Sequence, residues 1–199
     1  MDLEKAIAAL TARGFAVRYF ETAAEAAAAI DAAIDGKTVG FGGSVTLEQL
    51  GLFDRLSTHN TVFWHWRQSP AEARQASMTA QVYLLSANAI AETGQIVNID
   101  GTGNRVSASL YGHERVMFVA GVNKLAPDLP AAIARAKNIA APLNARRLGC
   151  KTPCALSEPM RCHDCASPTR ICNVTAVIDR PPRSVQQMDV ILVGEPLGY

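Results

Sequence analysis

Short apolar runs alternate with helical patterns along most of this chain. Apolar runs bounded by turn residues predict strands at residues 15–20, 37–41, 61–64, 82–85, 96–99, 116–120, 174–178 and 190–193. Apolar residues at helical spacing and capping signals predict helices over residues 2–13, 22–36, 44–50, 69–77, 106–111, 127–140 and 143–148. Strands separated by helices are typical of a parallel sheet covered on both faces. We therefore predict an α/β fold of three layers with a mainly parallel sheet.

No feature of the sequence divides the chain into separate domains. Residues 1–36 predict a helical amino-terminal part, in which Thr22 and Glu25 form a capping box at the start of an alanine-rich helix. We see no internal repeat and no linker rich in glycine, serine or proline. The sequence therefore predicts one domain over residues 1–199, with a cysteine-rich segment at residues 150–172 inside it.

Composition and charge exclude several classes of protein. Apolar residues make up 49% of the chain, and 19 basic residues nearly balance 18 acidic ones, which argues against intrinsic disorder and against general nucleic-acid binding. No apolar run reaches the roughly 20 residues that a membrane helix needs. Because the first residues, Met1–Lys5, lack the pattern of a secretory signal, we expect a cytoplasmic protein that binds neither nucleic acid nor membrane.

The first polar segment at a predicted strand end is rich in glycine. Gly42, Gly43, Ser44 and Thr46 follow a strand and precede a helix, the position where doubly wound sheets bind ligands. Glycines let a backbone approach a ligand closely, and a helix start attracts anions. The segment predicts anion or substrate binding, although a tight turn followed by a Ser44 cap explains it equally.

A second polar segment follows the strand predicted at residues 82–85. Ser86 and Asn88 bring polar groups to this strand end, and Glu92 is a candidate general base or nucleophile. In the alternative reading, Asn88 holds a turn and Thr93–Gly94 forms a hairpin.

The third polar segment combines an acid, an amide and a guanidinium between a strand and a helix. Asp100 is a second catalytic candidate, and it could bind one end of a polar substrate while Arg105 binds the other. The remaining ligand-binding candidates in this segment and after the next strand are Gly101, Gly103, Asn104, Asn123 and Lys124. A lysine there suits a phosphate or carboxylate. The alternative is a structural turn in which Asp100 pairs with Arg105, with Lys124 merely solvated.

All five cysteines fall between residues 150 and 172. An odd number of clustered cysteines argues against a disulfide framework. Four thiolates can hold Zn²⁺ or an iron–sulfur cluster. The candidate metal ligands are Cys154, Cys162, Cys165 and Cys172. Buried or redox-active free thiols remain the alternative.

Trp64 and Trp66, which flank His65, either wall a pocket or belong to the core.

The ordered motifs together resemble the LUD domain of lactate-utilisation proteins. The resemblance lies in residues 42–46, 86–94, 98–105, 121–124 and 195–199. It implies a fold like that of sugar-phosphate isomerases and CoA transferases, and a link to the oxidation of L-lactate to pyruvate beside iron–sulfur partner subunits. It assigns no catalytic residue. By analogy with such folds, the Gly42–Ser44 loop would receive a phosphate or coenzyme, and Glu92 or Asp100 would do proton or acyl chemistry.

Three functions remain open on these grounds. The first is a subunit or enzyme of lactate or related organic-acid metabolism that binds a small anionic substrate, lactate-like or phosphorylated. The second is a sugar-phosphate isomerase or CoA-transferase-like enzyme, and the third is an iron–sulfur or zinc redox protein or sensor. The predicted fold class also favours a homodimer.

Overall fold

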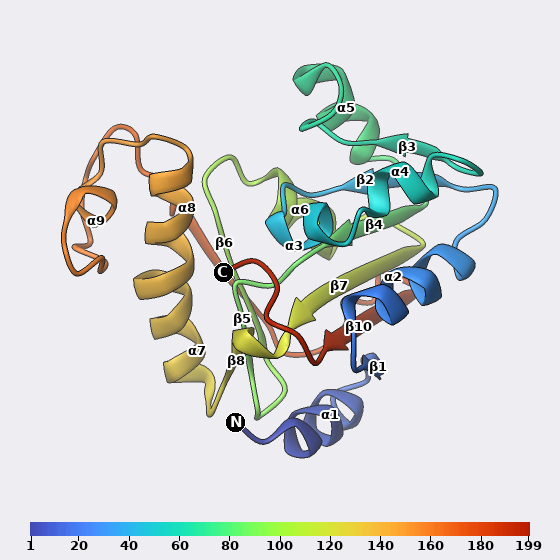
Figure 1. The fold of residues 1–199 in the computed structure, drawn as a ribbon, viewed down its shortest axis with the longest axis horizontal. Coiled ribbons are helices and arrows are strands. Elements are labelled where there is room, and N and C mark those ends of the chain that lie inside the picture. Colours follow the sequence, from blue (N-terminus) through green and yellow to red (C-terminus); the bar gives the residue numbers. More distant parts are fainter.

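Six parallel strands form the central sheet of the computed structural model, which describes residues 1–199 (Figure 1). Their order across the sheet is β1-β10-β7-β4-β2-β3, and every neighbouring pair is parallel. The strands are β1 (Ala16–Phe20), β2 (Thr38–Phe41), β3 (Thr61–Phe63), β4 (Val82–Leu85), β7 (Arg115–Gly121) and β10 (Gln187–Val193). The residues of β4 and most of those in β7 and β10 are buried, as expected for strands covered on both faces.

Helices pack on both faces of this sheet. One face packs against α2 (Ala23–Ala32), α3 (Val45–Gln49) and α4 (Leu52–Leu56). The other face packs against α1 (Leu3–Ala12) and α6 (Asn104–Leu110). The short helix α5 (Pro70–Ser77) packs against β2 and β3. The predicted three-layer α/β fold with a mainly parallel sheet is confirmed.

A smaller second sheet lies beside the central one. Its order is β8-β5-β6-β9, formed by β8 (Leu125–Ala126), β5 (Ala89–Ala91), β6 (Ile96–Asp100) and β9 (Val174–Ile178). β6 runs antiparallel to both β5 and β9. The predicted strands at 96–99 and 174–178 therefore exist but do not join the parallel sheet. A tight turn at Gly94, which has a φ of +90°, folds β5 back on β6 and confirms the alternative hairpin.

One helical run covers the outer face of the second sheet. It comprises α7 (Leu129–Arg135), the π-helical segment η2 (Ala136–Ala140) and α8 (Ala141–Arg147). The sequence predicts two helices here, and the predicted break is wrong. Pro142 has no N–H to donate to the carbonyl one turn earlier, and the wider π turn accommodates the proline without ending the helix.

The remaining elements are short. η1 (Val122–Lys124) is a 3₁₀ turn after β7, and α9 (Pro153–Leu156) is a single turn within the cysteine-rich segment. The rest of that segment is irregular up to β9. None of the helices has the length and apolar character that a bilayer crossing requires.

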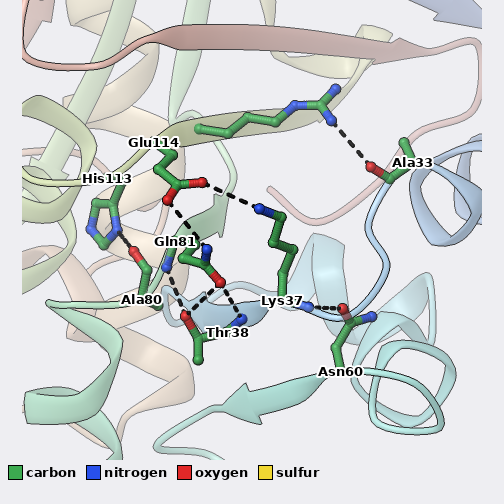
Figure 2. A network of polar contacts seen from close by, with 9 residues as sticks. Ala33, Lys37, Thr38, Asn60, Ala80, Gln81, His113 and Glu114 are labelled. Atoms are coloured by element: carbon green, nitrogen blue, oxygen red, sulfur yellow. Dashed lines mark hydrogen bonds and ion pairs between the residues drawn. The ribbon is translucent and has the colours of Figure 1, made fainter.

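A polar network joins the amino-terminal ends of β2, β4 and β7 (Figure 2). The backbone N–H of Gln81 donates to Thr38 Oγ1 at 2.9 Å, and its side chain donates to Glu114 Oε1 at 3.2 Å. Lys37 Nζ lies 3.4 Å from Glu114 Oε2. The network closes the end of the sheet opposite the carboxyl ends of the strands.

We expect Glu114→Ala to lower the free energy of unfolding by less than about 1 kcal/mol, because Lys37 and Glu114 are both exposed and water screens their attraction. Urea denaturation of the variant and the wild-type protein measures the difference. A loss well above that value would show that this network contributes more than exposed ion pairs do.

Candidate functional site

The strand order places a natural crevice beside β2 and β4. The chain leaves β2 towards β3 on one side and leaves β4 towards β7 on the other, so the two connections part at the carboxyl ends of these strands. Doubly wound sheets bind ligands at such a switch point. A cavity of about 320 Å³ lies here, bounded by the loops after β2, β3 and β4, the start of α6, the end of α8 and the carboxyl-terminal residues.

Lys124 is the most deeply buried cation of this cavity. Its side chain leaves η1 after β7, and Nζ donates to Thr46 Oγ1 and Ser86 Oγ, both at 2.8 Å. Burial, and then the nearby Arg105 and Arg135, lower the pKa of Lys124 to about 7. No carboxylate forms an ion pair with Lys124, so near neutral pH the amine is partly uncharged.

Arg105 is the second largely buried cation. Its guanidinium donates to Ser86 O at 3.0 Å, Asn88 Oδ1 at 2.8 Å and Ile99 O at 2.6 Å. These acceptors are neutral, and burial lowers the pKa of Arg105. The loop glycine Gly42 makes room for this side chain, since a Cβ there would lie 3.0 Å from Arg105 Cγ. Arg105 is therefore fixed in place by neutral oxygens, with its positive charge uncompensated by any ion pair.

Asp100 is the one acidic residue that lines the cavity. Its Oδ1 accepts from the N–H of Thr102, and its Oδ2 accepts from the N–H groups of Arg105 and Val106. The carboxylate thus caps the first turn of α6, whose preceding residue Gly103 has no side chain to do so. The predicted pairing with Arg105 therefore takes place through the backbone, and this geometry gives Asp100 a positioning role at the start of α6, while a catalytic role for Asp100 stays a prediction.

Glu92 does not reach the cavity. It follows β5, which runs antiparallel to β6, so Glu92 lies at the end of the second sheet opposite Asp100. Its Oε1 accepts from the N–H of Asp2 at 2.8 Å, and its Oε2 lies 3.5 Å from Lys5 Nζ. The prediction that places Glu92 with the other site residues is wrong in its geometry, because this strand end lies at a different edge.

The other predicted ligand-binding residues divide into two groups. Those that line the cavity are Gly43, Ser44, Thr46, Asn88, Gly101, Asn104, Arg105 and Lys124. Those that do not are Gly42, Gly103 and Asn123. Asn123 instead holds the carboxyl-terminal segment, since its Oδ1 accepts from the N–H of Leu197 at 3.1 Å.

Aromatic rings form the wall beside Gly43. A Cβ on Gly43 would lie 3.1 Å from Trp66 Nε1 and 3.2 Å from His65 Nε2, so only glycine lets these rings approach. Trp66 lines the cavity and stacks on Trp64, which belongs to the core. Both alternatives for this pair therefore hold, one for each indole. Burial, and then the nearby Arg74, lower the pKa of His65.

Several cavity residues carry no signal in a single sequence. Arg147 lines the cavity and lies over the Trp66 ring at 4.7 Å, and Arg135, which is outside the lining, donates to the carbonyls of Asn88 and Asn123. Arg74 and Tyr199 also line the cavity. Helical arginines such as these look like ordinary surface residues, because only the fold brings them to this edge.

The cysteine-rich segment lies on the side of the second sheet. All five cysteines are free and half-buried, and no three His, Cys, Asp or Glu side chains are grouped so as to hold a metal ion. Cys172 Sγ accepts from Arg170, and the backbone N–H of Cys162 donates to Asn138. Metal binding by Cys154, Cys162, Cys165 and Cys172 stays a prediction.

Comparison with solved structures and protein families assigns the class of the protein. The fold is similar to that of a DUF162 family protein from Deinococcus radiodurans, with a TM-score of 0.56, 15% sequence identity and 96% of each chain covered. The LUD domain model matches residues 3–193, and the chain therefore belongs to the LUD domain family, which is associated with lactate utilisation. No curated protein matches the sequence.

Proposed function

We propose that the protein binds a small anionic substrate of lactate or related organic-acid metabolism in the cavity beside β2 and β4. The observation that carries the proposal is the pair of Lys124 and Arg105, two basic residues at one cavity whose side-chain hydrogen bonds all go to neutral oxygens. Neither the Lys124 amine nor the Arg105 guanidinium forms an ion pair with a carboxylate, although Asp100 lies close enough to favour the charge of Arg105, and an anionic ligand supplies a direct counter-charge.

The remaining charges support the same ligand class. Arg74 and Arg147 add two cations to the wall, and the one carboxylate there, Asp100, is bound by backbone N–H groups. The cavity thus attracts anions at its rim as well as at its base. The family's association with lactate utilisation favours a short hydroxy acid or oxo acid as that anion.

Isothermal titration calorimetry with L-lactate and pyruvate tests the proposal. We expect at least one of them to bind, and we expect Lys124→Met to weaken that binding tenfold or more, equal to about 1.4 kcal/mol. Lys137→Met is the matched control, since Lys137 is exposed outside the cavity and its loss should leave the affinity unchanged.

A neutral ligand completes this test. Lactamide has nearly the shape of lactate without its charge, so it should not bind measurably. Equal affinity for lactamide and lactate, or no binding of any anion, would contradict recognition of an anion in this cavity.

A phosphorylated ligand is the second candidate. The rim cations Arg74 and Arg147 exceed what one carboxylate needs, and about 320 Å³ is at the low end of cavities that hold ligands larger than a three-carbon acid. Dihydroxyacetone phosphate and acetyl-CoA in the same titrations distinguish an isomerase-like or CoA-transferase-like site from an organic-acid site. Tighter binding of either one than of pyruvate would favour this second function.

A further inference from the structure

The Lys124 amine has the surroundings of a nucleophile rather than of a structural ion. Its side chain is only 3% exposed, and the two groups that accept its hydrogen bonds, Thr46 Oγ1 and Ser86 Oγ, are uncharged hydroxyls. A lysine held for stability would be expected to pair with a carboxylate, and this one has no such partner.

The backbone around Lys124 keeps the amine in place and partly shielded from water. Gly198 packs so closely that a Cβ there would lie 3.2 Å from Lys124 Nζ and 2.6 Å from Thr46 Oγ1. The N–H of Gly198 donates to Gln49 Oε1 at 2.7 Å, which fixes this segment against α3. The amine is thus oriented towards the cavity that it lines, with little freedom to move away.

The neighbouring cations suit a bound anion and an uncharged amine at the same time. Arg105 and Arg135 disfavour a positive charge on Lys124, so a large share of the amine carries a free electron pair near neutral pH. Arg105, fixed by three acceptors, remains positive and can hold a carboxylate or phosphate. A desolvated lysine beside another cation is a recognised way to activate an amine towards carbonyl carbon.

We propose that Lys124 Nζ forms a covalent imine with a small carbonyl compound that carries a carboxylate or a phosphate, a step that rests on the proposed binding function. The same chemistry covers a 2-oxo acid and a ketose phosphate. The cavity cations hold the anionic group and the amine takes the adjacent carbonyl carbon.

Atoms balance without an external oxidant or reductant. The nitrogen electron pair forms a C–N bond to the carbonyl carbon, and the C=O π electrons move to the oxygen, which takes a proton from nitrogen. The second N–H proton leaves with that oxygen as water, and a C=N bond remains. The hydroxyls of Thr46 and Ser86, each 2.8 Å from Nζ, are placed to pass these protons.

Reductive trapping with sodium borohydride tests the imine. The full chain is incubated with pyruvate or with dihydroxyacetone phosphate, reduced, digested and mapped by mass spectrometry. Borohydride delivers hydride to the imine carbon and turns the linkage into a stable secondary amine. We expect one predominant adduct, on Lys124, with the carbonyl compound that binds, and the choice of compound distinguishes the 2-oxo acid from the ketose phosphate.

Matched controls make the result decisive. Lys124→Met should lose the adduct, Lys137→Met should keep it, and L-lactate, which has no carbonyl, should give none. A compound that binds by calorimetry but leaves no adduct on Lys124 would overturn the imine and leave the binding function standing. Absence of binding as well would overturn both, and adducts spread evenly over the surface lysines would also contradict the proposal.

Discussion

Replacing Arg105 with methionine is expected to lower the free energy of unfolding by about 3 kcal/mol. The guanidinium is the hydrogen-bond donor that links α6 to the loop after β4, through Ser86 O and Asn88 Oδ1, and to β6, through Ile99 O. Methionine fills part of the volume but donates nothing, so Ser86 O and Ile99 O lose the hydrogen bond from Arg105, and Asn88 Oδ1 keeps only the one from the N–H of Ile99. Urea denaturation of the purified variant measures the loss.

Arg147→Met is the matched control for this variant. Arg147 lines the same cavity but is exposed, and it contacts Asn144, Tyr199 and the Trp66 ring. Its replacement should cost less than about 1 kcal/mol. If the two arginine variants lost similar stability, Arg105 would not have the linking role that its hydrogen bonds indicate.

Lys124→Met is expected to have the opposite effect and to raise the free energy of unfolding by about 3 kcal/mol below pH 7. In the folded protein the amine has a pKa of about 7, whereas the ordinary pKa of an exposed lysine is 10.5. Below pH 7 the wild-type fold therefore carries a buried charge that burial and two arginines disfavour. Methionine removes this charge and keeps the side chain apolar and of similar length.

The pH dependence gives this prediction its sign. Between about pH 7 and 10.5 the unfolded chain binds more protons at Lys124 than the folded chain does, so wild-type stability rises with pH in that window. The variant lacks this contribution, and its advantage should shrink as the pH rises and vanish towards pH 10.5. Thermal or urea unfolding of both proteins at several pH values measures it. An advantage that did not change with pH would show that burial does not shift the lysine as described.

The Lys124 and Arg105 variants are expected to change the free energy of unfolding in opposite directions. We expect Lys124 to destabilise the protein without ligand, as groups kept for binding or catalysis commonly do. Arg105 stabilises it, because its hydrogen bonds satisfy three backbone and amide oxygens. Two neighbouring cations of one cavity thus act on the fold in opposite directions.

The sequence was sufficient for most of the central sheet and insufficient for the second one. The strands at β2, β4 and β10 are apolar runs that stand out from their polar flanks. β6 is also buried along its whole length, because it lies between β5 and β9, but its apolar residues do not specify which sheet the strand joins. β5 and β8, of three and two residues, are too short for any periodicity.

The same limit explains what was found and missed at the site. Lys124 was found because it follows a strand of the parallel sheet, whose carboxyl ends share one edge. Glu92 was misplaced because it follows a strand of the other sheet that runs away from that edge. Asp100 was placed correctly, but a sequence does not show that its oxygens are already bound by backbone N–H groups.

The strand order also governs when the molecule can be completed during synthesis. β1 pairs with β10 alone, so β1, although it is made long before residues 187–193, has no partner in the sheet until they emerge. β10 then joins β1 to β7, and the residues after it, including Gly198, come to lie against Lys124 and Thr46. Closure of the central sheet and completion of the cavity wall therefore belong to the same late event, and a nascent chain that stops short of β10 has neither.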